Sequence, residues 1–156
     1  RTMHQIRYPR RINRMNKAKE CTFKCKKISG GKAEGPLLIS KDRVCFYLAD
    51  PESGKITEKD HDLEGKSVAG KVVVMPSGKG SSVVQADGLY KLSKFNNSPK
   101  ALIVREADTV LVATAIVLEI PMVFKVEEDF YQKIVEGNCV ILDADAGLIT
   151  LKVDGA

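Results

Sequence analysis

Tryptophan is absent from the 156-residue sequence, and histidine occurs only twice, as His4 and His61. A metal site built from several histidines is therefore excluded. No apolar run approaches the roughly 20 residues that cross a bilayer, so we expect no membrane partner. The basic first segment lacks both the apolar core and the small-residue cleavage site of a secretory signal. These absences favour a cytoplasmic protein.

Cysteine is scarce as well, with four residues at positions 21, 25, 45 and 139. Cys21 and Cys25 have the spacing CxxxC in a segment typical of a strand, where positions four apart share one face. No second cysteine pair or histidine pair accompanies them with the spacing of a zinc site. We therefore expect small buried thiols in a reducing compartment and no metal ligated by this chain.

The formal charge of +5 is distributed unevenly. Residues 1–20 contain seven basic side chains and one acidic one, which leaves 18 of the 25 basic and 19 of the 20 acidic residues for the rest. The body is nearly neutral, so its charge does not favour a nucleic-acid partner. We expect residues 1–19 to form a basic, disordered leader and residues 20–156 to form one folded domain.

Hydrophobic periodicity divides the body into a strand-rich beginning, a βαβαβ middle and a β-rich end. We expect strands at 21–29, 36–40, 44–48, 72–75, 101–104, 120–124, 139–142 and 148–151. We expect helices at 83–95, 109–118 and 127–135, and a polar loop over 49–70. This mixture predicts an α/β domain with layered β/β/α architecture.

The segment 75–82, MPSGKGSS, is the strongest candidate in the sequence for a catalytic or binding site. A buried strand leads through two glycines into a helix, so backbone N–H groups and the helix N-terminus converge on a small volume that favours an anion. The spacing is not that of a nucleotide-binding P-loop, because Val73 stands where a glycine is required and Gly80 follows Lys79. It is not GxGxxG either, because the last position is Val83.

Ser81 begins the expected helix, and two interpretations remain open for it. Serine is a common N-cap, so its role could be structural. It could also be a reactive hydroxyl at a positive helix end, with Lys79 as the nearby cation. A Ser-His-Asp nucleophile would depend on His61 alone. A base in the alkoxide form needs more positive charge, and the sequence shows no second cation cluster around the loop, so the missing parts must come from elsewhere.

Ordered motifs along residues 28–124 resemble the small subunits of aconitase X. The core of the resemblance is PSGKGS at 76–81, preceded by GKS at 65–67 and GKV at 70–72. Upstream motifs are GGKAEG at 30–35 and DPESG at 50–54, and downstream motifs are READ at 105–108 and IPMV at 120–123. With GKS, GKV and PSGKGS taken together as one motif, five ordered motifs make the resemblance specific.

The resemblance implies a swivelling three-layer β/β/α domain like the mobile C-terminal domain of aconitases. It also implies a heterodimer with a large catalytic subunit that holds a 4Fe–4S cluster. The archaeal branch dehydrates mevalonate 5-phosphate to anhydromevalonate phosphate, whereas the bacterial branch dehydrates cis-3-hydroxyproline. Lys79 and Ser82 favour the archaeal reaction, because the bacterial proteins usually have arginine and cysteine there.

Carried over by position, the resemblance makes Ser81 the proton acceptor while the cluster iron acts as a Lewis acid on the departing hydroxyl. Contacts to the small anionic hydroxy-acid substrate are then expected from Ser77, Gly78, Lys79, Gly80, Ser82 and Arg105. Ser77 and Ser82 are the alternative acceptors, and a structural salt bridge is the alternative for Arg105. A non-catalytic swivelling domain that binds phosphate or another anion, and an enzyme that acts on phosphate compounds alone, are competing functions.

Three positions depart from the family pattern. Val104 replaces the usual asparagine, Glu119 the usual glycine, and Phe124 the usual aspartate. The loop at 75–82 is intact, but these replacements weaken a substrate role for the segment 104–124.

Overall fold

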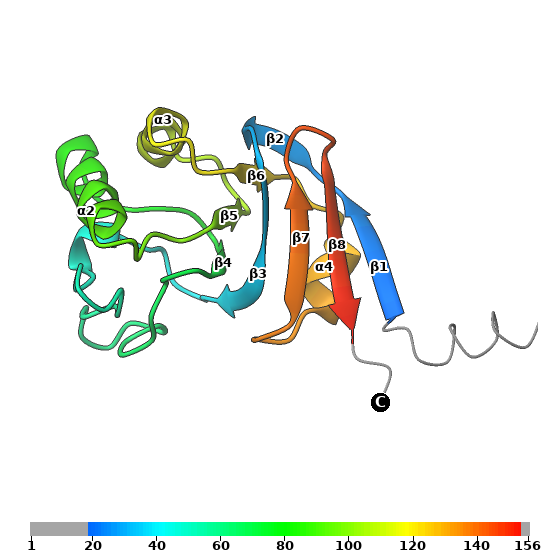
Figure 1. The fold of residues 1–156 in the computed structure, drawn as a ribbon, viewed down its shortest axis with the longest axis horizontal. Coiled ribbons are helices and arrows are strands. Elements are labelled where there is room, and N and C mark those ends of the chain that lie inside the picture. Colours follow the sequence, from blue (N-terminus) through cyan, green and yellow to red (C-terminus); the bar gives the residue numbers. More distant parts are fainter. Residues whose placement is uncertain (1–18, 154–156) are drawn as a thin grey trace, which may run out of the picture.

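The computed structural model describes residues 19–153, which form two layers of strands and a layer of two helices, with a third, short helix beside the strands at the other side (Figure 1). The expected leader lies outside the described residues except for Lys19, where the first strand begins. The strands are β1 (Lys19–Lys24), β2 (Lys26–Ser29), β3 (Lys32–Ile39), β4 (Val72–Met75), β5 (Ala101–Val104), β6 (Met122–Phe124), β7 (Cys139–Asp143) and β8 (Leu148–Val153). The helices are α2 (Ser82–Lys94), α3 (Thr109–Val117) and α4 (Glu128–Lys133), with a short 3₁₀ helix η1 (Phe46–Leu48). None of the helices in this part of the chain is long and apolar enough to cross a bilayer.

The strands follow one another in the order β1-β8-β7-β3-β4-β5-β6-β2. Strands β3, β4, β5 and β6 are parallel, and β2 pairs with β6 in the antiparallel sense. Strands β1, β8, β7 and the first part of β3 form an antiparallel sheet. Strand β3 belongs to both, because residues 32–36 pair with β7 and residues 37–39 pair with β4. Figure 1 shows β3 between the two groups of strands.

The strand expected at 21–29 is divided at Cys25. Strand β1 pairs with β8, whereas β2 pairs with β6 at the other end of the strand order. The chain passes from one sheet to the other at this point, and the Cys25 N–H donates to the Gly147 carbonyl at 3.0 Å instead of to a neighbouring strand. The alternating pattern predicted extended backbone but could not reveal this change of partner.

Two hydrophobic cores explain the three layers. The first lies between the parallel strands and α2, α3 and the segment 44–68, and it includes Phe46, Leu89 and Leu111. The second lies between the two sheets, where Phe130 of α4 packs against Phe23 of β1 with ring centroids 5.4 Å apart. Every residue of β4 and β5 is buried, as expected for strands covered on both faces. The β/β/α architecture is thus confirmed.

Residues 44–48 do not form the expected strand. Val44 makes one parallel bridge to Gly78, and the chain then turns into η1. This turn lies so close to α2 that a Cβ atom at Gly88 would collide with the backbone of Phe46 and Tyr47. The glycine that weakens the helix in isolation is therefore required by the close approach of another segment.

The segment 49–70 has no regular strand or helix but is not a loose loop. It buries Ile56, Leu63 and Val68 against the helical layer. Isolated bridges tie Ile56 to Ala49 and to Glu64. Long irregular segments that are this well packed usually have a function.

Glu119 occupies a position where glycine is favoured by the backbone. It has φ = 57°, and the end of α3 is a Schellman motif, in which the Ile120 N–H donates to the Ala115 carbonyl at 2.9 Å. Glu119 also places a negative charge at the negative end of the helix. We expect Glu119→Gly to raise the free energy of unfolding by about 1 kcal/mol, measured by urea denaturation.

The control is Glu119→Ala, which removes the charge but keeps a Cβ atom in the left-handed region. It should gain only the smaller electrostatic part, a few tenths of a kcal/mol. Equal stability of the glycine and alanine variants would contradict the backbone explanation.

Candidate active site

The loops that follow β3, β4 and β5 lie together at the carboxyl ends of these parallel strands. The Val44 N–H donates to the Ser77 carbonyl at 3.1 Å, and the Lys79 N–H donates to the Val44 carbonyl at 3.2 Å. The Arg105 N–H donates to the Pro76 carbonyl at 3.1 Å. In open α/β sheets this edge is where ligands bind. The expected site residues therefore share one edge of the domain.

Ser81 is the N-cap of α2, and its side chain is exposed. Its Oγ accepts a hydrogen bond from the Val84 N–H at 3.4 Å, a long distance that leaves the hydroxyl weakly held. Gly80 before it has φ = 102°, and a Cβ atom there would lie 3.0 Å from the Cys45 Sγ. The glycine thus lets the loop turn tightly and presents Ser81 to solvent at the positive end of α2.

Gln85 holds the loop 76–81, which we call the glycine loop, from beneath. The sequence did not predict this role. Its side chain is completely buried. Its Nε2 donates to the carbonyls of Val44 and Lys79, both at 3.1 Å, and its Oε1 accepts from the Phe46 N–H at 2.7 Å. One amide therefore ties three segments together: α2, the loop after β4 and the start of η1. A glutamine on a helix normally indicates an exposed face, so no sequence signal pointed to this role.

Lys79 does not extend freely toward Ser81. Its Nζ lies 2.6 Å from the Glu58 Oε2, so the expected cation is paired with a carboxylate from the segment 49–70. A salt bridge of this partly exposed kind contributes only about 0 to 1 kcal/mol, so it can open when a stronger anion competes. A substrate contact from Lys79 stays a prediction that requires this opening.

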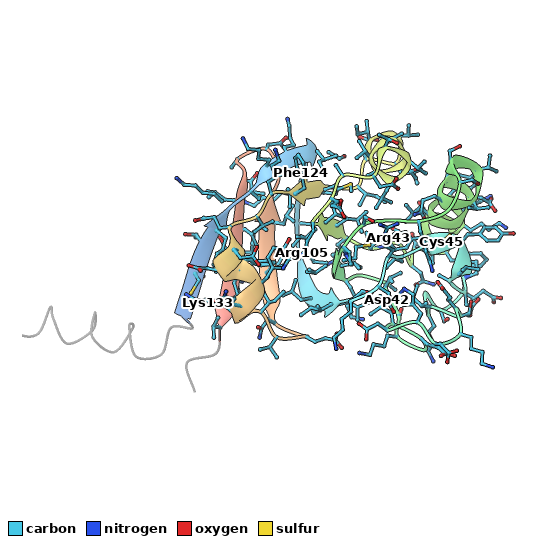
Figure 2. All side chains as sticks on the ribbon, turned by 180° about the vertical axis from the view of Figure 1, so that it is seen from behind. Asp42, Arg43, Cys45, Arg105, Phe124 and Lys133 are labelled. Carbon is cyan, nitrogen blue, oxygen red and sulfur yellow. The ribbon has the colours of Figure 1, made fainter. Side chains whose placement is uncertain are left out.

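Arg105 points away from the glycine loop, toward α4. Its guanidinium lies 3.7 Å from the centre of the Tyr131 ring, and both terminal nitrogens lie 3.3 Å from the carboxylate of Glu128. Burial raises the pKa of Tyr131, and the positive charge of Arg105 opposes this shift. In Figure 2 Arg105 lies at the side where α4 packs. The geometry matches the structural salt bridge that was the alternative interpretation.

The remaining expected polar residues occupy different environments. Ser77 is buried and donates to the Gly78 carbonyl at 3.2 Å, whereas Ser82 is exposed at the first position of α2. His61 is buried, with Nε2 2.8 Å from the Arg43 carbonyl and Nδ1 accepting from the Leu63 N–H at 2.9 Å. Both imidazole nitrogens are engaged with backbone groups, so His61 is not the base of a catalytic triad with Ser81.

A single further basic side chain, that of Arg43, lies beside the loop. Arg43 lines a small polar pocket at the carboxyl ends of β4 and β5. The other residues that line this pocket are Ser77, Gly78, Glu106, Ala107 and Asp108. Lys41 and Arg105 line a neighbouring pocket. The sequence could not show this, because Arg43 is more than 30 residues from the glycine loop and only the fold brings them together.

The cysteines do not form a cluster suited to iron or zinc. Burial, with a smaller contribution from Asp143, raises the pKa of the Cys25 thiol to about 11, so it stays protonated at neutral pH and is a poor metal ligand. Among the described residues, no three side chains of histidine, cysteine, aspartate or glutamate lie close enough to hold a metal ion. The donor set of this part of the chain does not fit an iron–sulfur cluster, which requires about four thiolates.

Comparison with known proteins gives consistent results over most of the chain. The family model described as "Aconitase X swivel domain" matches residues 22–151. The phosphomevalonate dehydratase small subunit of Thermococcus kodakarensis is 43% identical over 134 residues, covering 85% of this chain and 98% of that one. The subunit of the same name from Methanosarcina mazei is 40% identical, covering 85% and 92%. The crystal structure of Thermococcus kodakaraensis aconitase X in its holo form superposes with a TM-score of 0.75 at 42% identity, covering 84% of this chain and 98% of that one.

Proposed function

Because the chain belongs to the aconitase X swivel domain family, we propose that it is the small subunit of a phosphomevalonate dehydratase. The observation that carries the proposal is the exposed Ser81 hydroxyl at the N-terminus of α2, held on a loop that Gln85 fixes from below. The chain is similar over nearly its whole folded length to subunits that bear this name. The substrate we propose is mevalonate 5-phosphate, and the product is anhydromevalonate phosphate.

In this reaction we assign Ser81 the role of proton acceptor. Its Oγ takes the proton from the carbon next to the one that carries the hydroxyl group. The electrons of the broken C–H bond form the C=C bond, and the hydroxyl group leaves with its bonding electrons. When bound in the partner, a 4Fe–4S cluster would supply Lewis-acid assistance to the departing hydroxyl.

Ser81 cannot reach the alkoxide form with the help of this chain alone. The N-terminus of α2 stabilises a negative charge by about 0.5 to 2 kcal/mol, which corresponds to about one unit of pKa. The pKa of a serine hydroxyl lies many units above neutrality, so most of the required stabilisation is missing. Lys79 does not supply it while its ammonium is paired with Glu58. A large subunit must therefore bring further positive charge and exclude water.

The helical layer offers a surface for such a subunit. Exposed large apolar side chains lie on α2, at its C-cap and on α3, namely Val83, Tyr90, Phe95, Ile116 and Val117. Between the two helices lies an apolar groove of about 510 Å³ that extends to Ser82, next to the proposed proton acceptor. A partner that closes over Ser81 would cover this groove at the same time. Such a partner would explain why the groove exposes apolar side chains, which are unfavourable in water.

Co-expression with a large subunit and an assay of the purified complex test the proposed function. We expect a stable heterodimer that dehydrates mevalonate 5-phosphate, and an isolated small subunit without activity. The same complex should not dehydrate cis-3-hydroxyproline. Dehydration of cis-3-hydroxyproline alone would assign the chain to the other branch of the family. Full activity of the isolated chain would contradict the need for a partner.

A further inference from the structure

We propose that the polar pocket between the loops after β3, β4 and β5 binds the phosphate group of the substrate, with Arg43 as its charged contact. The inference rests on the proposed function and adds to it the residues that recognise the phosphate. The pocket has a volume of about 190 Å³, several times the roughly 30 Å³ that a water molecule occupies. It lies on the loop that carries Ser81, so a substrate could reach both.

The first argument comes from which basic side chains around the loop have a carboxylate partner. Lys79 is paired with Glu58, and Arg105 is paired with Glu128 and stacked on Tyr131. Arg43 is exposed, and its guanidinium has no carboxylate partner among residues 20–153. A guanidinium that is not paired can form two parallel hydrogen bonds to phosphate oxygens without first breaking a salt bridge.

The second argument comes from the backbone of the pocket. The N–H groups of Gly78, Ala107 and Asp108 have no acceptor within the described part of the chain. Neighbouring amides are satisfied, since those of Arg105 and Glu106 both donate to the Pro76 carbonyl. Free backbone N–H groups on two adjacent loops form the kind of concave surface that binds anions.

The third argument concerns how Arg43 is held. Its carbonyl accepts from the Nε2 of the buried His61, and the Val44 N–H that follows donates to Ser77. The backbone of Arg43 is thus fixed on both sides while its side chain stays available. Positions fixed in this way lose less entropy when they bind a ligand.

Two carboxylates line the same pocket and limit its affinity. Asp108 is engaged as the N-cap of α3, where its Oδ2 accepts from the Leu111 N–H at 3.2 Å. Glu106 has no hydrogen-bond partner for its side chain among the described residues, and its charge opposes an incoming phosphate. The proposal therefore predicts opposite effects for the two charged residues Arg43 and Glu106.

The decisive experiment measures steady-state kinetics of the heterodimer with mevalonate 5-phosphate. We expect Arg43→Gln to raise KM about tenfold with kcat nearly unchanged, and Glu106→Gln to lower KM. The matched control is Lys32→Gln, which removes one positive charge at the opposite end of β3 and should leave KM unchanged. An unchanged KM in Arg43→Gln, or an equal rise in Lys32→Gln, would overturn the assignment.

A second measurement keeps this inference separate from the proposed function. Inorganic phosphate is titrated into the ¹⁵N-labelled full chain, and the amide resonances of Gly78, Ala107 and Asp108 are followed. These resonances should shift in the unmodified chain and not in Arg43→Gln. If the heterodimer fails to act on mevalonate 5-phosphate but these shifts occur, the proposed function is wrong and the anion site stands. Absence of the shifts, with normal kinetics in Arg43→Gln, rejects the site alone.

Discussion

Replacing Ser81 by alanine should lower kcat of the heterodimer by about a thousandfold or more while the two subunits still assemble. General base catalysis by a positioned side chain commonly contributes a factor of about 10² to 10⁴. Ser77 and His61 are not available as substitute bases, because Ser77 is buried and both nitrogens of His61 are hydrogen-bonded. The measurement is steady-state turnover of mevalonate 5-phosphate, with heterodimer content checked by size-exclusion chromatography.

Ser82→Ala is the matched control for this prediction. Ser82 is the neighbouring exposed hydroxyl, but it lies in the first turn of α2 and does not cap it. The same loss of one hydroxyl should therefore leave kcat within about threefold of the unmodified enzyme. A fully active Ser81→Ala variant would remove the basis of the proposed mechanism. A reversal of the two effects would move the role of proton acceptor to Ser82.

Gln85→Leu should cause a large loss of stability. The leucine leaves the Phe46 N–H and the Lys79 carbonyl without their partner, and the Val44 carbonyl keeps only the Lys79 N–H. An unsatisfied buried group costs about 1 to 3 kcal/mol, so we expect the free energy of unfolding to fall by about 3 to 5 kcal/mol. Urea denaturation monitored by circular dichroism measures this change.

The control for Gln85→Leu is the same substitution at Gln132, which is exposed on α4. That variant should change the free energy of unfolding by less than about 0.5 kcal/mol. In a heterodimer with Gln85→Leu, kcat should fall by a larger factor than KM rises, because the loop that carries Ser81 is no longer fixed. Stability equal to that of Gln132→Leu would show that the three hydrogen bonds do not hold the loop.

The parts of the fold that were predictable are those whose pattern is local. Strands β4 and β5 are short, continuously apolar runs, and each is followed by a helix at the expected place. The change of partner at Cys25 was not predictable, because it depends on strands more than 90 residues away. The 3₁₀ turn at Phe46 was missed for the same reason, since its shape is set by contact with Gly88 of α2.

The candidate site was also predictable only where its residues lie close together in the sequence. The motif around Ser81 lies in one continuous segment, so spacing and resemblance could identify it. Arg43 and Gln85 were missed because neither belongs to that motif and their roles arise from hydrogen bonds between distant segments. The pairing of Lys79 with Glu58 was equally inaccessible, since charge alone does not say which carboxylate lies nearby.

The position of β8 has a consequence for how the protein is made. This strand is the last one that the structure describes, yet it lies between β1, which is synthesised first, and β7. While the ribosome is still translating residues 148–153, the apolar faces of Phe23 and Val140 have no completed sheet to cover them. The edges of β1 and β7 that pair with β8 stay unpaired until β8 has been made, so folding should be slow and should benefit from chaperones.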